Sequence, residues 1–316
     1  MSAMTPPDSS GRLMLLDSAS LYFRAFFGVP DQRSDPSQPP TNAIRGFLDM
    51  IASLIGTHRP THFVACWDND WRPAFRVDAI PTYKAHRLVD GSVVQEESPE
   101  DLTPQVPVIV DALKALGFPR LGADGFEADD VIGTLTARHK GTMAVDVVTG
   151  DRDLFQLVDD AADVRVIYTA RGGVRDPDLV DEAFLQTKYA VANGPAYADM
   201  AVLRGDTSDG LPGVAGIGEK TAAKLIEKYG TLVALRRAVD SGDPEIKGAQ
   251  RARLEAGAAY LDVAPNVVRV APDAPVAEVD MTLPSEVADP VLMSKIASEF
   301  GVTSSFNRVL SALRIE

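Results

Sequence analysis

Seven acidic residues fall into three tight groups along this 316-residue chain. The groups are Glu127 with Asp129 and Asp130, Asp151 with Asp153, and Asp206 with Asp209. Carboxylates gathered this closely repel one another and cost stability unless cations neutralise them. Because no His or Cys lies beside them, the oxygen-only ligands indicate Mg²⁺ or Mn²⁺ rather than zinc. The pattern therefore predicts a metal-dependent phosphoryl-transfer enzyme.

Each group also has a simpler interpretation. The first would place favourable negative charge at a helix N-terminus, and the other two could only form turns. Their joint occurrence favours the metal interpretation. Two ions about 4 Å apart would activate a water and stabilise the leaving oxygen of an in-line displacement at phosphorus.

The elements that must position these groups alternate between apolar strands and helical patterns. Strands are predicted at residues 13–17, 62–67 and 143–148, and helices at residues 41–55, 106–116 and 127–138. This alternation is typical of a parallel sheet, in which ligands bind beyond the carboxyl ends of the strands. Asp17, Asp68 and Asp151 each follow a predicted strand. We therefore expect them to converge at one edge of the sheet.

The chain divides into four predicted segments. Residues 1–11 are expected to be disordered, and residues 12–185 to form an α/β core that contains a separate segment at about 72–105. Residues 186–263 are expected to be helical, and residues 264–316 to return to the core, with a strand at 267–270. The net charge of −14 argues against nonspecific coating of nucleic acid, but it does not exclude a nuclease with local basic patches. With one cysteine, Cys66, and no spanning apolar run, the protein is expected to be cytoplasmic.

A glycine-rich hairpin in the helical segment forms a second signal. Gly213, Gly216 and Gly218 precede Lys220 and Lys224, a spacing typical of a helix-hairpin-helix that presents backbone N–H groups to phosphate. Residues 211–237 hold five Lys/Arg against two Glu, a local balance of +3 in an acidic chain. The alternative is a plain helix-entry loop with solvated lysines. The charge contrast favours a contact with a duplex backbone.

Residues 72–87 combine basic and aromatic side chains. Arg72, Arg76, Lys84 and Arg87 accompany one aspartate in this stretch, and Tyr83 stands beside the lysine. Cations for phosphate next to a ring for base stacking suit a frayed or single-stranded end. Taken alone, the segment could be an ordinary surface loop.

Together these strings resemble the 5′-nuclease (flap endonuclease) superfamily, and especially the 5′→3′ exonuclease domain of bacterial DNA polymerase I. The matching strings occur in the family's order over residues 13–230: 15–18 and 22–27, 67–68 and 75–76, 83–87, 125–130, 149–153, 205–209, and the hairpin through Thr221. The resemblance implies that residues 12–185 form a PIN-like parallel-sheet nuclease core with a helical arch at about 72–105. It also implies that residues 186–263 form a helix-hairpin-helix (H3TH) DNA-binding domain. It also implies a stand-alone, monomeric paralogue of that polymerase domain.

The resemblance carries specific roles onto matching positions. Two or three Mg²⁺ or Mn²⁺ would be held by nine carboxylates: Asp17, Asp68, Glu127, Asp129, Asp130, Asp151, Asp153, Asp206 and Asp209. Lys84, with Arg76 as a second candidate, would stabilise charge on the scissile phosphate. DNA contacts are expected from Arg24, Arg72, Tyr83, Arg87, Gly213, Gly216, Gly218, Lys220, Thr221 and Lys224. The hairpin carbonyls, including those of Val214 and Gly216, are expected to be able to bind K⁺.

The expected activity is cleavage of DNA 5′ flaps, nicks and 5′ ends in replication and repair, with RNA–DNA hybrids as further candidate substrates. The alternatives are a PIN-like ribonuclease acting on RNA and a non-catalytic junction-binding module. One departure from the family lies after Arg87. Residues 90–101 hold five acidic residues and no basic one, where the family usually has a Pro-rich arch.

Overall fold

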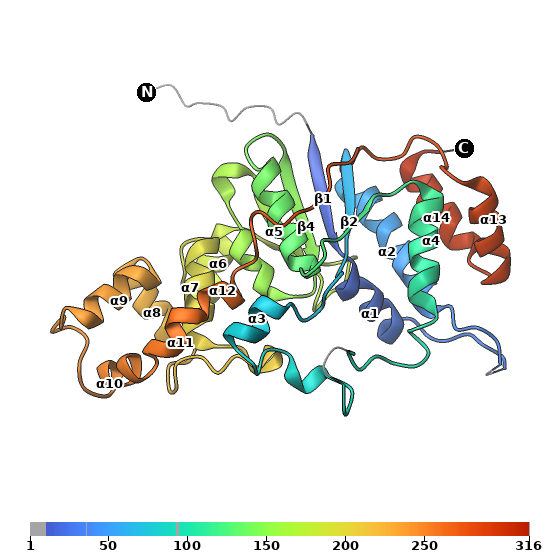
Figure 1. Ribbon diagram of the computed structural model, residues 1–316. Helices are drawn as coiled ribbons and strands as arrows, with labels where there is room; N and C mark the ends of the chain where they lie inside the picture. Colours follow the sequence, from blue (N-terminus) through green and yellow to red (C-terminus); the bar gives the residue numbers. More distant parts are fainter. Residues whose placement is uncertain (1–10, 36, 93–94, 316) are drawn as a thin grey trace, which may run out of the picture.

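The computed structural model describes residues 11–35, 37–92 and 95–315, and a mostly parallel six-stranded sheet lies at its centre (Figure 1). The strand order is β3-β2-β1-β4-β5-β6, and only the β5–β6 pair is antiparallel. The strands are β1 (Arg12–Asp17), β2 (His62–Cys66), β3 (Arg120–Leu121), β4 (Ala144–Thr149), β5 (Val164–Tyr168) and β6 (Asp178–Val180). No helix of the described ranges is long and apolar enough to cross a membrane.

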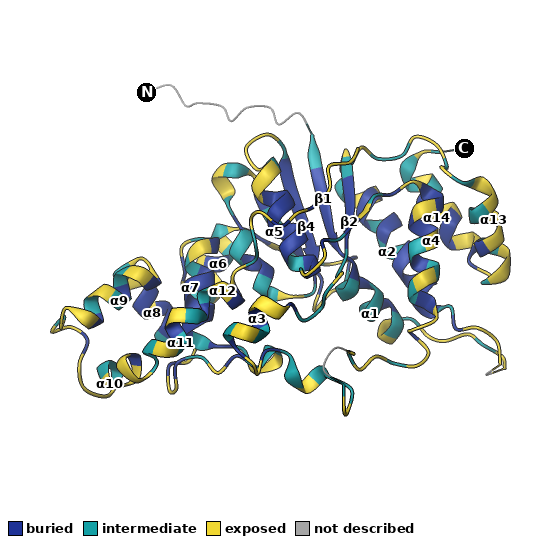
Figure 2. Cartoon of the chain, viewed as in Figure 1, coloured by how far each residue is buried: buried dark blue, intermediate teal, exposed yellow. Residues whose placement is uncertain are grey.

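Both faces of the sheet are covered, as the buried strands in Figure 2 show. Alternate side chains of β1 enter two different cores, since Leu13 and Leu15 pack on one face while Met14 and Leu16 pack on the other. The first face is covered by α5 (Ala128–His139) and the start of the helical region. The second is covered by α1 (Ser18–Gly28), α2 (Asn42–His58), α4 (Gln105–Leu116), α13 (Pro290–Glu299) and α14 (Thr303–Leu313).

A helical region follows β6 and extends to one side of the sheet (Figure 1). It comprises α6 (Glu182–Tyr189), α7 (Gly194–Arg204), α8 (Glu219–Tyr229), α9 (Leu232–Asp240), α10 (Gly248–Ala256), α11 (Ala258–Val263) and α12 (Pro265–Val268). The chain then returns past the sheet, where Thr282 bridges to His62. It ends with α13 packed against α4 and α14 packed against α2.

The predicted strands and helices of the first 150 residues are confirmed, with shifts of a few residues at their ends. The strand predicted at residues 267–270 is wrong, because Pro265 starts the short helix α12, which packs against α3 (Ala74–Ala79) and α7. The strands β3, β5 and β6 were not predicted from the sequence. Between α3 and α4, the only regular helical structure among the described residues is the 3-10 turn η1 (Ala85–Arg87). The expected disordered N-terminus lies outside the described residues except for Gly11, whose carbonyl accepts a hydrogen bond from the Ala144 backbone N–H.

Candidate metal-dependent active site

Three adjacent strands end at the same edge of the sheet and bring distant carboxylates together. β1 lies between β2 and β4, with parallel pairing on both sides. Asp17 is the last residue of β1, Asp68 follows β2 by two residues, and Asp151 follows β4 by two residues. All three line one pocket of about 430 Å³, as expected from the carboxyl ends of parallel strands.

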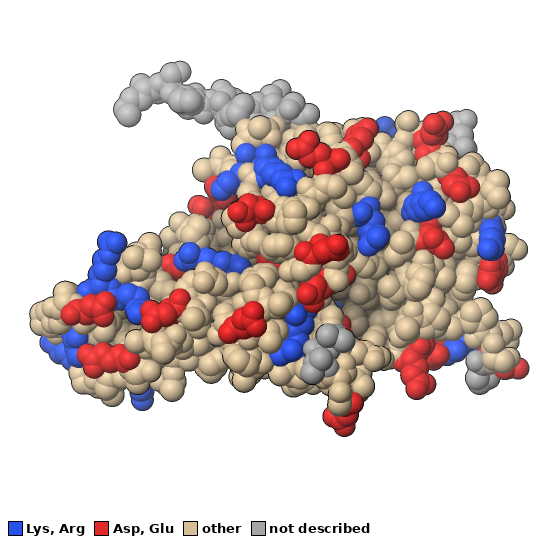
Figure 3. Space-filling view, viewed as in Figure 1, with Lys and Arg blue, Asp and Glu red and all other residues tan. Residues whose placement is uncertain are grey.

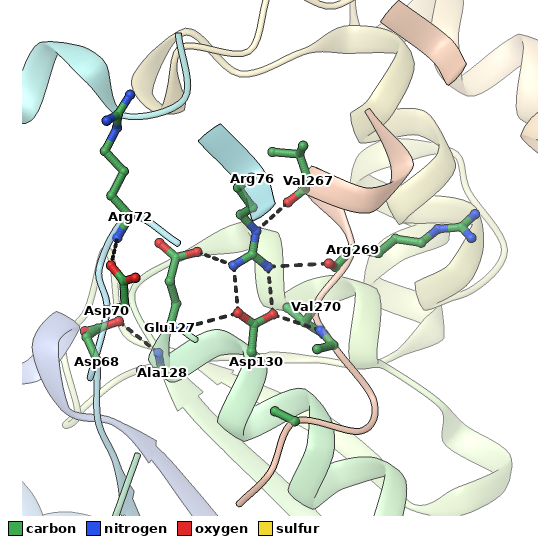
Figure 4. A network of polar contacts seen from close by, with 12 residues as sticks. Asp68, Asp70, Arg72, Arg76, Glu127, Ala128, Asp130, Val267, Arg269 and Val270 are labelled. Atoms are coloured by element: carbon green, nitrogen blue, oxygen red, sulfur yellow. Dashed lines mark hydrogen bonds and ion pairs between the residues drawn. The ribbon is translucent and has the colours of Figure 1, made fainter. Parts of the chain in front are cut away.

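The N-terminus of α5 adds two more carboxylates to this pocket. Glu127 caps the helix and Asp129 lies in its first turn, and both line the pocket. Asp68 accepts a hydrogen bond of 2.8 Å from the Ala128 backbone N–H, so the strand end and the helix start hold each other in place (Figure 4). Asp129 receives no hydrogen bond or ion pair from any residue that the structure describes. Its carboxylate is therefore free to bind a ligand.

The crowding of negative charge is visible in the pKa values. Burial, followed by the charge of Asp68, raises the pKa of Asp17 to about 7, although a hydrogen bond from Thr149 (2.7 Å) opposes the shift. Burial and the charges of Asp17 and Asp151 hold the pKa of Asp129 well above its usual range. A bound cation would relieve both penalties, so the oxygen-only donor set fits Mg²⁺ or Mn²⁺.

The pocket carboxylates surround a space rather than meeting at one point. Within residues 11–35, 37–92 and 95–315, no three His, Cys, Asp or Glu side chains lie close enough to enclose an ion. Mutual repulsion keeps uncompensated carboxylates apart. Ion binding would therefore draw these side chains inward.

Three further predicted ligands, Asp153, Asp206 and Asp209, form a separate group beside the pocket, and arginines pair with Asp206 and Asp209. Asp206 lies 3.3 Å from Arg152 and 3.6 Å from Arg204, and Asp209 lies 2.6 Å from Arg87. Although burial opposes it, hydrogen bonds from Ser208 and Arg152 lower the pKa of Asp206. Asp153 belongs to this group too, and burial together with the charge of Asp151 raises its pKa well above the usual range.

Arg76 is not placed to touch a substrate phosphate. Its side chain is 2% exposed and donates to Glu127 at 2.6 Å and to Asp130 at 2.7 Å from each of two guanidinium nitrogens (Figure 4). It also donates to the Val267 carbonyl, so it ties α3 and α5 to α12. Burial and these contacts thus hold the guanidinium away from the pocket, so the geometry argues against the catalytic role, which stays a prediction.

Asp130 is held by the same network. It is fully buried, and besides Arg76 it accepts hydrogen bonds from the Glu127 and Ala271 backbone N–H groups. Both of its oxygens accept hydrogen bonds, and it does not line the pocket. Asp130 thus ties the helix start to the returning chain, and its role as a metal ligand stays a prediction.

Two of the predicted DNA contacts also serve the fold. Tyr83 is 3% exposed, and its hydroxyl donates to Glu127 at 2.7 Å, so its ring is not available for base stacking. Arg72 donates to the carbonyls of Tyr83 (2.6 Å) and Pro81 (2.9 Å) and so braces the loop before Lys84. Arg24, a third predicted DNA contact, donates to the Ala170 carbonyl at 3.2–3.3 Å.

Lys84 does line the pocket. Its backbone adopts the left-handed conformation (φ 49°), and its N–H donates to the Asp209 carbonyl at 2.9 Å. Its ammonium group pairs with Glu127, and although burial opposes it, this carboxylate keeps the pKa of Lys84 above its usual value. Lys84 is thus a fully charged cation held at the wall of an acidic pocket.

The predicted hairpin joins α7 to α8. Gly213 and Gly216 both have positive φ, and a Cβ on Gly213 would lie 2.4 Å from the Arg204 carbonyl oxygen. Gly218 caps α8, on which Lys220 and Lys224 are exposed and Thr221 is half-buried. Figure 3 shows further Lys and Arg gathered over the end of the helical region, near α9 and α10.

The hairpin carbonyls expected to bind K⁺ already have donors. The Gly216 carbonyl accepts from the Arg253 guanidinium at 3.1 Å, and the Val214 carbonyl accepts from the Ile217 backbone N–H at 2.9 Å. A K⁺ ion at Gly216 would share this carbonyl oxygen with the Arg253 guanidinium, whose positive charge would oppose binding. The K⁺ site stays a prediction.

Several residues that shape the site were not predicted from the sequence. Thr149 and Ser20 hold Asp17 and the turn after β4, since Ser20 accepts from the Gly150 backbone N–H at 2.7 Å. Arg152 and Arg204 neutralise the second acidic group, and the position of Arg152 between two aspartates was a signal for this. Glu96 also lines the pocket, which the sequence could not reveal. It belongs to the acidic stretch of residues 90–101, called the acidic insertion below.

Comparison with known proteins gives one consistent result. The family model for the 5′-3′ exonuclease N-terminal resolvase-like domain matches residues 12–190, and that for the C-terminal SAM fold matches residues 193–289. A 5′-3′ exonuclease of Streptomyces coelicolor is 54% identical over 95% of this chain and 99% of the relative. A 5′-3′ exonuclease of Mycobacterium tuberculosis is 47% identical over 95% of this chain and 97% of the relative.

Solved structures share the fold at low identity. The T5 D15 protein, co-crystallised with metal ions, superposes with a TM-score of 0.63 at 19% identity, over 96% of this chain and 98% of that one. The catalytic core of Rad2 in complex with DNA substrate gives a TM-score of 0.58 at 15% identity, over 96% and 92% of the two chains. The α/β core and the helical region are thus a known arrangement.

Proposed function

Since the chain belongs to the 5′-3′ exonuclease family, we propose that it is a divalent-metal-dependent nuclease that cleaves DNA at 5′ flaps, nicks and 5′ ends. One observation carries the proposal. Five carboxylates from three strand ends and one helix start line a single pocket together with a lysine: Asp17, Asp68, Glu127, Asp129, Asp151 and Lys84.

Within this proposal, Asp17, Asp68, Asp129 and Asp151 would hold Mg²⁺ or Mn²⁺. Bound ions would supply the activated water and offset negative charge on the scissile phosphate, as in other metal-dependent phosphodiesterases. Asp153, Asp206 and Asp209 lie beside the pocket and would complete a second ion site if their arginines released them.

Lys84 would contribute electrostatic stabilisation of the transition state. Its ammonium group is a point charge on a flexible stem, so it can leave Glu127 and reach a phosphate in the pocket. Glu127 is a positioning residue, because Arg76 (Figure 4) and the Tyr83 hydroxyl fix its carboxylate, and it in turn keeps Lys84 at the pocket wall.

The hairpin would bind the duplex part of the DNA substrate at a distance from the bond that is cleaved. Lys220 and Lys224 are exposed and lie one turn apart on α8, so both can reach the same phosphate backbone. Contacts of this kind track the backbone and carry no sequence information. Their position fits a substrate selected by structure rather than by sequence.

The test is cleavage of matched substrates that share one internally labelled strand. A 5′ flap, a nicked duplex, a blunt duplex, an RNA–DNA hybrid and a single-stranded RNA would each be incubated with Mg²⁺, Mn²⁺, Ca²⁺ or EDTA. We expect cleavage of the flap and the nick with Mg²⁺ or Mn²⁺ and none with EDTA. Preferential cutting of the RNA would instead support a PIN-like ribonuclease, and binding to junctions without any cutting would support a non-catalytic module.

A further inference from the structure

Glu96 places a carboxylate of the acidic insertion inside the active-site pocket. It lines the same pocket as Asp17, Asp68, Glu127, Asp129 and Asp151, and also an adjoining recess of about 420 Å³. The recess shares Phe23 and Arg87 with the pocket. Glu96 therefore stands where the pocket opens outward, at its mouth.

The backbone at Glu96 is held in place by strand-like pairing. Glu96 forms an antiparallel bridge with Leu88. On either side of it, the Glu97 N–H donates to the Arg87 carbonyl at 2.8 Å, and the Val89 N–H donates to the Gln95 carbonyl at 3.0 Å. The backbone at Glu96 is thus fixed relative to Arg87.

The cations near Glu96 are already engaged elsewhere. Arg87 pairs with Asp209 at 2.6 Å, and Lys84 pairs with Glu127. Among the described residues Glu96 forms no ion pair. Burial raises the pKa of its carboxyl, the charges of Arg87 and Lys84 oppose this shift, and the charge of Asp68 adds to it. A nucleic-acid strand passing through the mouth would therefore bring phosphates against a negative charge that no ion pair neutralises.

We propose that Glu96 is a selectivity residue that disfavours a long single-stranded 5′ extension at the mouth of the pocket. This inference rests on the proposed nuclease function. A nicked duplex ends at the cleavage site and places few phosphates beyond it, whereas a long flap must carry several past Glu96. The fixed charge lowers the affinity for the flap more than for the nick, and the protein accordingly favours 5′ ends with little or no extension.

The experiment compares Glu96→Gln with the parent on a nick and a long 5′ flap that share one duplex. Glutamine keeps the shape and removes the charge. We expect the flap-to-nick ratio of kcat/KM to rise about 3- to 10-fold at low salt, the effect of removing one screened like charge. The gain should shrink as ionic strength rises. Glu100→Gln is the control, because Glu100 is exposed, belongs to the same insertion and lines neither cavity.

Binding gives a second measurement that does not depend on cleavage. In Ca²⁺ without turnover, Glu96→Gln should tighten binding of a fluorescent flap relative to the nick by a similar factor. An unchanged ratio at low salt in both assays would overturn the proposal. A large rise in the Mn²⁺ concentration needed for half-maximal activity would also overturn it, because Glu96 would then serve the metal. If the parent cuts no substrate, the proposed function fails, and the binding ratio still decides the role of Glu96.

Discussion

Replacing Arg76 with methionine tests whether this residue serves the fold or the chemistry. The side chain is 2% exposed and makes three contacts of 2.6–2.7 Å with Glu127 and Asp130. Methionine leaves Asp130 buried with no cation beside it. Removing one partner of a buried ion pair costs about 3–5 kcal/mol, so we expect the free energy of unfolding to fall by that amount.

Urea unfolding followed by circular dichroism measures this loss. The control is Arg308→Met, which breaks the exposed Arg308–Asp49 pair and should cost about 1 kcal/mol at most. Adding Asp130→Asn to Arg76→Met should restore about 1 kcal/mol or more, because it removes the stranded charge. At a temperature where the single variant stays folded, its kcat on a flap should remain within about tenfold of the parent.

The opposite pattern would refute this reasoning. If Arg76→Met unfolds like the parent while kcat falls by orders of magnitude, Arg76 contacts the reacting phosphate. The buried network in Figure 4 would then not represent the functional state.

Three further predictions concern charge. In the metal-free protein, Asp17 has a pKa of about 7 against 3.8 for the free side chain, so the folded state keeps a proton that the unfolded chain loses. The free energy of unfolding should therefore fall by up to about 4 kcal/mol between pH 4 and pH 7, and saturating Mn²⁺ should abolish that loss, as chemical denaturation in EDTA and in Mn²⁺ would show. Lys220→Ala with Lys224→Ala should raise KM on duplex-bearing substrates far more than it lowers kcat, and should flatten the salt dependence of binding by about two units of slope; unchanged binding across salt concentrations would make the hairpin a structural turn only. Because Arg253 donates to the Gly216 carbonyl, duplex binding by the parent should be the same in K⁺ and in a large organic cation at equal ionic strength, while Arg253→Ala should bind better in K⁺; a clear K⁺ requirement in the parent would contradict this.

The sequence predicted the parts of the fold that depend on strong local patterns. The strands that end at Asp17 and precede Asp68 and Asp151 are mostly apolar runs, interrupted in β4 by Asp146. The carboxylate at or after the end of each could be placed at one sheet edge by topology alone. β3 and β6 were not predicted, because strands of two and three residues are too short to show an alternation of apolar and polar side chains. A strand was predicted at residues 267–270 because valine has a high β-propensity. In the structure, Val267 and Val268 instead complete the short helix α12, which Pro265 begins.

The site was predicted by residue type but not by partner. Asp129 and Asp130 are neighbours in the sequence, yet the helical turn directs one into the pocket and the other toward Arg76. Likewise Tyr83 and Lys84 are adjacent, and only Lys84 lines the pocket. Which of these side chains is buried, and which partner it binds, depends on contacts between residues far apart in the sequence. Tyr83 and Glu127, for example, are 44 positions apart. Local spacing does not encode such contacts.

The most direct test of the metal site is Asp129→Asn, measured as kcat on a 5′ flap with saturating Mn²⁺. Asp129 lines the pocket without a partner among the described residues, and asparagine keeps its shape while removing the charge that would bind the ion. Asp111→Asn on the exposed face of α4 is the matched control. The structure predicts a kcat reduced by about 10²-fold or more in Asp129→Asn alone, with unchanged flap binding in Ca²⁺. Cleavage by Asp129→Asn at the rate of the parent would contradict the assignment of this pocket as the metal-dependent active site.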